Sequence, residues 1–283
     1  MKLMRLGAPG HERPAVRTDD GTVRDLSGLT GDIDGPFLAA GGVGRVRDAL
    51  EAGTLPVLDA EGLRVGAPVA RPGKVVCVGL NYRDHAAETG ALVPERPVVF
   101  MKDPGTVVGP YDTVLVPRGS DKTDWEVELA VVIGSRARYL ETPDDAAGVI
   151  AGYAVSNDVS EREFQLELSP QWDLGKSCET FNPLGPWLVT ADEVADPQAL
   201  GLRLSVNGVP RQNGAAENMI FPVAYLVWYL SQYMVLEPGD VINTGTPAGV
   251  ALGLPDNPYL RAGDVVELEI DGLGGQRQVF ADA

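Results

Sequence analysis

Short apolar runs alternate along the chain with turns rich in glycine, proline and aspartate. Near the N-terminus, runs at 2–6, 14–18 and 22–25 have the length of strands, and the turn Asp19-Asp20-Gly21 separates the last two. Further along, the pattern predicts a buried strand at 74–79 and helices at 43–52, 84–88, 144–150 and 221–233. The spacing favours an α+β protein that is rich in strands.

A passage rich in proline and glycine interrupts this pattern at 66–73, with the sequence Gly66-Ala67-Pro68-Val69-Ala70-Arg71-Pro72-Gly73. Such a composition is typical of a linker. We therefore predict a small N-terminal domain at 1–68 and a larger domain at 69–283, which opens with the apolar strand.

The composition narrows the class of protein. The 283 residues carry a formal net charge of −17, which opposes binding to nucleic acid or to an anionic membrane surface. The longest apolar stretch, at 221–236, is broken by Gln232 and is too short to span a bilayer. The first residues lack the apolar core of a signal peptide. We expect a cytoplasmic protein in which Cys77 and Cys178 are free thiols.

Three carboxylates provide the strongest candidate chemistry. Glu126 and Glu128 lie one residue apart in a strand-like run, so both side chains leave the same face, about 7 Å apart. Asp158 also ends an apolar run. A site of oxygen ligands without cysteine or histidine favours Mg²⁺ or Mn²⁺ over Zn²⁺. The alternative is that the glutamates line the wet face of a half-exposed strand.

The chain has only two histidines, which narrows the search for a base that works near neutral pH. His11 lies in a turn of proline and glycine, where exposure is expected. His85 and Glu88 are three residues apart on a predicted helix, so the carboxylate can orient the imidazole. The alternative is an ordinary exposed pair on a helix surface.

Further polar residues lie near these groups in the sequence. Arg162 and Gln165 share a predicted helical face and could hold a substrate oxygen, or belong to a charged helix surface. Lys176 stands alone among glycine and apolar residues, where it could serve as an electrophile or remain a solvated loop lysine. The loop at 243–250 offers hydroxyls and backbone N–H groups but lacks the spacing of a phosphate-binding loop.

Taken in order, seven motifs between Arg71 and the C-terminus resemble the fumarylacetoacetate hydrolase family. They are G-L-N-Y-R-D-H-A-A-E, F-M-K, D-W-E-V-E-L-A-V-V-I-G, G-Y-A-V-S-N-D-V-S-E-R-E-F-Q, G-K-S-C-E-T-F-N-P-L-G-P-W, M-I-F and L-E-P-G-D-V-I-N-T-G-T-P-A-G-V. The resemblance implies a mixed β-roll, usually a homodimer, with the catalytic domain at 69–283. The first 70 residues resemble the family's small N-terminal domain more weakly.

The resemblance also implies roles for particular residues. It implies Mg²⁺ or Mn²⁺ held by Glu126, Glu128 and Asp158, a base dyad of His85 and Glu88 on a lid, Lys176 near the substrate carbonyl, and substrate contacts from Arg162, Gln165 and Thr246. Two departures concern the distal substrate contacts: Glu179 replaces a usual aspartate, and 213–216 lacks a hydroxyl residue often found there.

Within the family, the runs S-E-R-E-F-Q-L-E, W-D-x-G-K and M-K-L-M-R-L-G look most like hydrolases of 2,4-diketo-3-deoxy-L-fuconate and L-rhamnonate. The resemblance thus implies a hydrolase that cleaves a C–C bond of a small 2,4-diketo acid to give pyruvate and a carboxylic acid. An oxaloacetate decarboxylase, or an isomerase or lyase, would use the same metal and enolate chemistry. A metal-binding member without catalysis is the remaining alternative. The sequence leaves the acyl group and the choice of metal open.

Overall fold

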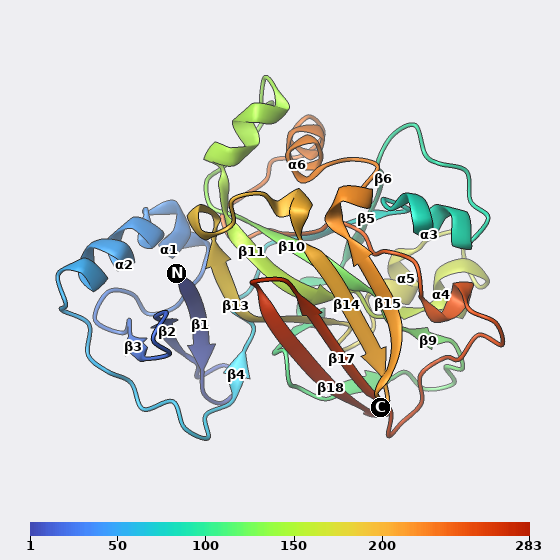
Figure 1. Ribbon diagram of the computed structural model, residues 1–283, viewed down its shortest axis with the longest axis horizontal. Helices are drawn as coiled ribbons and strands as arrows, with labels where there is room; N and C mark the ends of the chain where they lie inside the picture. The colour runs from blue at the N-terminus through green and yellow to red at the C-terminus, as the bar shows by residue number, and fades with distance from the viewer.

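A computed structural model describes residues 1–283 (Figure 1). Its largest sheet has eleven strands in the order β3-β2-β1-β13-β11-β10-β16-β5-β6, with β4 paired to β1 and β7 paired to β13. The strands span Lys2–Leu6 (β1), Arg13–Arg17 (β2), Val23–Asp25 (β3), Val65–Gly66 (β4), Val75–Gly79 (β5), Val98–Lys102 (β6), Val107–Val108 (β7), Val127–Ile133 (β10), Ile150–Asn157 (β11), Asn182–Thr190 (β13) and Val241–Asn243 (β16).

A second sheet has five strands in the order β15-β14-β17-β18-β8 and packs across one face of the first sheet (Figure 1). Its strands span Val114–Val116 (β8), Gly201–Val206 (β14), Val209–Ala215 (β15), Val265–Ile270 (β17) and Gly274–Asp282 (β18). A small pair consists of Thr123–Asp124 (β9) and Ser160–Glu161 (β12). The two larger sheets enclose the main core, so the fold is the strand-rich α+β architecture that the apolar pattern predicts.

Strand β10 lies at the centre of the large sheet, and all seven of its residues are buried. Val127, Leu129 and Val131 point into the core between the two sheets, whereas Ala130 and Val132 point into a second core on the opposite face. Because apolar layers cover both faces, β10 has no wet face. The alternative in which Glu126 and Glu128 line a half-exposed strand is therefore excluded.

The helices are short and lie around the sheets. They span Gly35–Ala39 (α1), Gly42–Glu51 (α2), Arg83–Glu88 (α3), Arg162–Leu166 (α4), Asp173–Lys176 (α5) and Val223–Ser231 (α6). Single 3₁₀ turns occur at Pro104–Thr106 (η1), Pro143–Gly148 (η2), Ala191–Glu193 (η3), Pro197–Ala199 (η4), Ala216–Asn218 (η5) and Ala251–Gly253 (η6). No helix has the length and apolar character needed to cross a membrane.

The helix predicted at 144–150 is a 3₁₀ turn, η2, which begins with Pro143 and ends at Gly148. The helix predicted at 221–233 is shorter, because Pro222 occupies the N-cap of α6. By contrast, the helices predicted at 43–52 and 84–88 agree with α2 and α3 within one residue.

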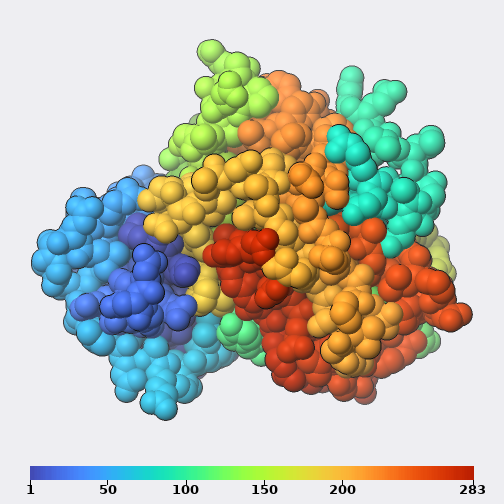
Figure 2. All heavy atoms as spheres, viewed as in Figure 1, coloured from blue at the N-terminus to red at the C-terminus, as the bar shows by residue number.

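The N-terminal segment joins the large sheet instead of standing apart. Strand β1 pairs antiparallel with β13, with Lys2 opposite Val189 (Figure 2 shows this segment in blue, packed against the remainder). The passage at 66–73, interpreted from its composition as a linker, packs inside the molecule, since Val69 and Ala70 are buried. The passage is therefore packed and not exposed, and both the linker and the domain division at residue 68 stay predictions.

Candidate active site

Two antiparallel strands bring the three predicted carboxylates together. Glu126 precedes β10, Glu128 lies on it, and Asp158 follows β11, whose Ser156 is opposite Glu128. The backbone N–H of Asp158 also donates to the carbonyl of Glu126 over 2.9 Å. Carboxylate oxygens of the three side chains all lie within 4.8 Å of one another, and each side chain is buried. The structure therefore forms one carboxylate cluster of Glu126, Glu128 and Asp158.

Two buried lysines contact this cluster. Lys176, the last residue of α5, places its Nζ 2.8 Å from Oε2 of Glu126 and 3.0 Å from Oδ2 of Asp158. Lys102, at the end of β6, pairs with Asp158 and donates to the carbonyl of Val159 over 2.9 Å. The alternative of a solvated loop lysine at 176 is wrong. Sequence reasoning missed Lys102, although the motif F-M-K showed a charge at the end of an apolar strand.

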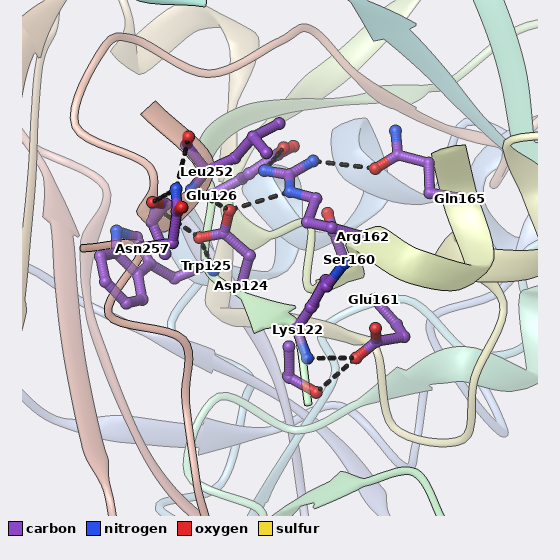
Figure 3. Close-up of polar contacts among 12 residues, drawn as sticks. Lys122, Asp124, Trp125, Glu126, Ser160, Glu161, Arg162, Gln165, Leu252 and Asn257 are labelled. Atoms are coloured by element: carbon purple, nitrogen blue, oxygen red, sulfur yellow. Dashed lines mark hydrogen bonds and ion pairs between the residues drawn. The ribbon is translucent and has the colours of Figure 1, made fainter. Parts of the chain in front are cut away.

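Arg162 extends the cluster through Asp124 (Figure 3). Its Nε donates to Asp124 over 2.8 Å, its Nη2 to Glu126 over 2.7 Å and its Nη1 to Oε1 of Gln165 over 3.0 Å. Asp124 also accepts the backbone N–H groups of Ala251 and Leu252 over 2.7 and 3.0 Å. The ordinary helix surface considered for Arg162 is excluded, because the arginine is buried. Asp124 was missed; its signal was an acidic residue directly before Trp125-Glu126.

The charges of this network do not balance. Burial opposes ionisation of Glu126, but the charges of Lys176 and Arg162 outweigh burial and hold the pKa of Glu126 well below its ordinary value. Burial raises the pKa of Glu128 well above its ordinary value, and the carboxylates of Asp158 and Glu126 raise it further. Glu128 forms no ion pair, and it accepts the backbone N–H of Gly245 over 2.7 Å. The cluster therefore lacks a cation at Glu128.

Lys176 remains an ammonium in this setting. Burial lowers the pKa of Lys176, but the negative charges of Asp158 and Glu126 outweigh burial and raise it above the ordinary value. Two of its three N–H donors face these carboxylates, so one is left for another oxygen. This geometry suits electrostatic stabilisation of an anion and opposes a role as a neutral amine nucleophile.

His85 and Glu88 approach the cluster from α3. The imidazole Nδ1 lies 3.4 Å from Oε1 of Glu88, and Oε2 of Glu88 accepts the backbone N–H of Gly249 over 2.6 Å. His85 is buried, so the alternative of an exposed helix pair is wrong. With Nδ1 turned to Glu88, Nε2 is the ring nitrogen left for a proton transfer.

A cavity of about 250 Å³ joins these groups. Its polar lining comes from His85, Thr89, Glu126, Glu128, Arg162, Gln165, Lys176 and Thr246, and its apolar lining includes Leu80, Ala91, Phe100, Leu166, Trp172 and Leu252. The hydroxyl of Thr246 donates to the carbonyl of Val127 over 2.9 Å and accepts from Gln212 over 2.8 Å. Every residue predicted from the sequence except Asp158 and Glu88 lines the cavity itself, and those two contact residues that do.

Comparisons with known proteins define the family. The family model described as fumarylacetoacetate (FAA) hydrolase C-terminal matches residues 74–281. A Burkholderia multivorans protein that carries a general hydrolase name is 52% identical over 280 residues, which cover 99% of this chain and 98% of its own. The chain therefore belongs to the fumarylacetoacetate hydrolase family, whose members include hydrolases and isomerases.

Two solved structures are similar over this whole chain. A 2-hydroxyhepta-2,4-diene-1,7-dioate isomerase from Mycobacterium marinum is 32% identical, is covered over 98% of its chain and gives a TM-score of 0.77. A maleylpyruvate hydrolase from Sphingobium sp. SYK-6, in complex with manganese(II) ion and pyruvate, is 27% identical, is covered over 100% and gives a TM-score of 0.81. The family fold expected from the sequence is confirmed.

Proposed function

We propose that this protein is a Mg²⁺- or Mn²⁺-dependent hydrolase that cleaves the C3–C4 bond of a 2,4-diketo acid and yields pyruvate and a carboxylic acid. One observation carries the proposal: two carboxylates of the cluster, the ammonium of Lys176 and the imidazole of His85 line a single cavity. The similar maleylpyruvate hydrolase, in complex with manganese(II) and pyruvate, supports it.

The residues fit a divalent cation. Four buried carboxyl groups, including Asp124, face three buried cations, Lys102, Arg162 and Lys176, so ionisation of all four calls for one more cation. Carboxylate oxygens are the ligands that Mg²⁺ and Mn²⁺ prefer, and Glu126, Glu128 and Asp158 would hold the ion. A divalent ion bound there would supply Lewis-acid polarisation of the substrate's oxo-acid oxygens.

His85 would act as the base toward water. Its Nε2 would take a proton as the water oxygen bonds to C4, and Glu88 would hold the ring through Nδ1. The C3–C4 bond then breaks, and its electron pair stays on C3 as the enolate of pyruvate. The proton held by His85 returns to C3, so atoms and charges balance.

Lys176 would stabilise the negative charge that develops on the enolate oxygen. Its third N–H donor is left free by the bonds to Glu126 and Asp158. Gln165, which Arg162 orients through Oε1, would offer its amide nitrogen to a substrate oxygen. The hydroxyl of Thr246 donates its hydrogen to the carbonyl of Val127, so it would contact a substrate oxygen only by giving up that bond.

An assay of pyruvate release tests this function. The full-length protein, first treated with chelator, is supplied with Mg²⁺ or Mn²⁺ and a panel of acylpyruvates, diketo-deoxy sugar acids and oxaloacetate. We expect pyruvate from at least one 2,4-diketo acid and none in excess chelator. Full activity in chelator would exclude the metal mechanism, whereas pyruvate from oxaloacetate alone would favour the decarboxylase and an isomerised diene acid without pyruvate would favour the isomerase.

A further inference from the structure

The lining of the cavity is chemically of two kinds. The carboxylate cluster and its cations provide the polar part, and the apolar part, which we call the apolar wall, comes from Leu80, Ala91, Phe100, Leu166, Trp172 and Leu252. We infer that the acyl group of the substrate, from C5 outward, is apolar and packs on this wall. The inference rests on the proposed function and deepens it by excluding polyhydroxylated and acidic acyl groups as preferred substrates.

Two aromatic residues form the centre of the apolar wall. The rings of Phe100 and Trp172 meet edge to face, with centroids 5.5 Å apart and planes at 62°. Trp172 lies so close to β5 that a Cβ at Gly79 would be 2.5 Å from its Cζ3 atom. The indole can therefore pack there only because residue 79 is glycine. Gly79 lies in β5, Phe100 in β6, and Trp172 at the N-cap of α5. Regular elements therefore hold this part of the wall in place.

The aromatic wall directly adjoins the groups assigned to the reaction. Nζ of Lys176 lies 5.1 Å from the centre of the Phe100 ring and 2.8 Å from Oε2 of Glu126. In the inferred binding mode, a substrate whose carboxylate and oxo oxygens lie at the cluster continues past Lys176 toward Phe100 and Trp172. The first carbons of the acyl group would contact aromatic carbon.

Apart from the free donors assigned above to the reacting end of the substrate, polar side chains of the cavity are engaged with the protein. Arg162 donates from all three of its nitrogens to Asp124, Glu126 and Gln165. Thr89 donates its hydroxyl to the carbonyl of His85 over 3.0 Å. A distal carboxylate or hydroxyl on the acyl group would lose its hydration and find no charged partner on the apolar wall. Because an unpaired polar group loses its hydration there without gaining a partner, the wall disfavours such groups by a factor of roughly 10 to 100.

A substrate panel tests the inference on the full-length, Mn²⁺-loaded protein. The panel contains hexanoylpyruvate and benzoylpyruvate as apolar substrates, maleylpyruvate with a second carboxylate, and a 2,4-diketo-3-deoxy sugar acid with hydroxyls. We expect kcat/KM for the better apolar substrate to exceed that for the other two by at least tenfold. Equal values, or a preference for maleylpyruvate or the sugar acid, would overturn the inference while leaving the proposed hydrolase intact. No pyruvate from any 2,4-diketo acid would overturn both.

A charge placed on the wall provides the second measurement. Leu166 lines the cavity but is 44% exposed, so Leu166→Lys should fold. We expect the ratio of kcat/KM for hexanoylpyruvate over maleylpyruvate to fall at least tenfold. Leu168→Lys is the matched control, because Leu168 is 66% exposed and does not line the cavity, and its ratio should stay at the wild-type value. The same ratio in both variants would show that the apolar wall does not set specificity.

Discussion

At the scale of single residues, the site is a chain of alternating charges. Arg162 pairs with Asp124 and Glu126, and Lys176 pairs with Glu126 and Asp158. Lys102 also pairs with Asp158 and is the last residue of the chain of charges. Such buried charges are tolerated only when they are paired, because each loses its hydration on folding. The exception is Glu128, which has no cation within ion-pair distance, and this exception is the physical basis for a metal ion there.

Replacing the unpaired carboxylate tests that interpretation. Glu128→Gln removes the charge at nearly constant volume, so we expect loss of Mn²⁺ binding by calorimetry and loss of pyruvate release. Because Glu128 is buried without a cation, the free energy of unfolding of the metal-free variant should equal or exceed that of the wild type. Glu217→Gln, at an exposed position, is the control. Undiminished Mn²⁺ affinity in Glu128→Gln would refute the assignment.

Lys176→Met separates electrostatic stabilisation from metal binding. The ammonium is proposed to act on the developing enolate, so kcat should fall at least a hundredfold while KM changes much less. Mn²⁺ binding should persist, because Lys176 pairs with the carboxylates of Glu126 and Asp158 and an ammonium cannot be a ligand of the ion. Lys122→Met, which removes a half-exposed lysine paired with Glu167, serves as the control. Unchanged kcat would show that Lys176 does not take part in the reaction.

Residue patterns predicted only part of this network. The spacing of Glu126 and Glu128 on a strand placed both carboxylates on one face, and the apolar neighbours indicated burial. Lys102 and Asp124 could not be assigned in the same way, because a single buried charge has no periodicity. Their partners lie 56 and 38 residues away in the chain, and such pairings depend on the strand order.

At the scale of elements, α3 is attached to the loop after β16 through one side chain. Glu88 accepts the backbone N–H of Gly249 and lies against Gly253, where an added Cβ would approach its carboxylate carbon to 2.3 Å. The glycine at 253 therefore makes room for the carboxylate that orients His85. Any side chain there must displace the end of Glu88.

Gly253→Ala should reduce the rate without unfolding the protein. The methyl group would move a flexible carboxylate and not the backbone, so the circular dichroism should stay native while kcat falls about tenfold or more. Gly44→Ala is the matched control: it lies in α2 with open space around its Cβ, and helix propensity predicts a gain of about 1 kcal/mol or less. Equal kcat in both variants would show that the placement of Glu88 does not matter.

Element prediction was uneven where the segments are short. The helical face predicted for Arg162 and Gln165 agrees with α4, but α5 has four residues, which is too few for a helical period to show. The start of α6 was misplaced because Pro222 is the N-cap, so the helix begins at Val223, after the apolar pattern has already begun. β1 and β5 could be predicted, since their apolar runs coincide with strands, but their neighbours β13 and β16 follow from pairings far apart in the sequence.

At the scale of the whole molecule, an ion-pair network secures the N-terminal segment. Glu12, whose side chain is only 6% exposed, bridges Arg5 and Arg64, with distances of 3.1 and 3.0 Å. Arg64 continues to Asp112, in the larger part of the chain. No sequence pattern predicted this network, because its members are scattered over about a hundred residues and no short motif contains them.

Glu12→Gln should destabilise the folded chain without changing the chemistry. The amide removes the anion that the two guanidinium groups share, but Arg5 keeps Asp32 and Arg64 keeps Asp112, so we expect a loss of about 1 kcal/mol. We expect a lower urea midpoint with an unchanged kcat of the folded fraction. Glu61→Gln, at an exposed position without an ion pair, should leave the midpoint in place. Equal midpoints for both variants would show that the network contributes nothing to stability.

The central claim is that water, activated beside the carboxylate cluster, cleaves a C–C bond. The most direct measurement is mass spectrometry of both products after the Mn²⁺-loaded protein has turned over an acylpyruvate in ¹⁸O-labelled water. Hydrolysis at C4 predicts one ¹⁸O in the released carboxylic acid, equimolar amounts of acid and pyruvate, and no product from Glu128→Gln. A rearranged substrate without cleavage, or pyruvate formed without a labelled acid, would contradict the account.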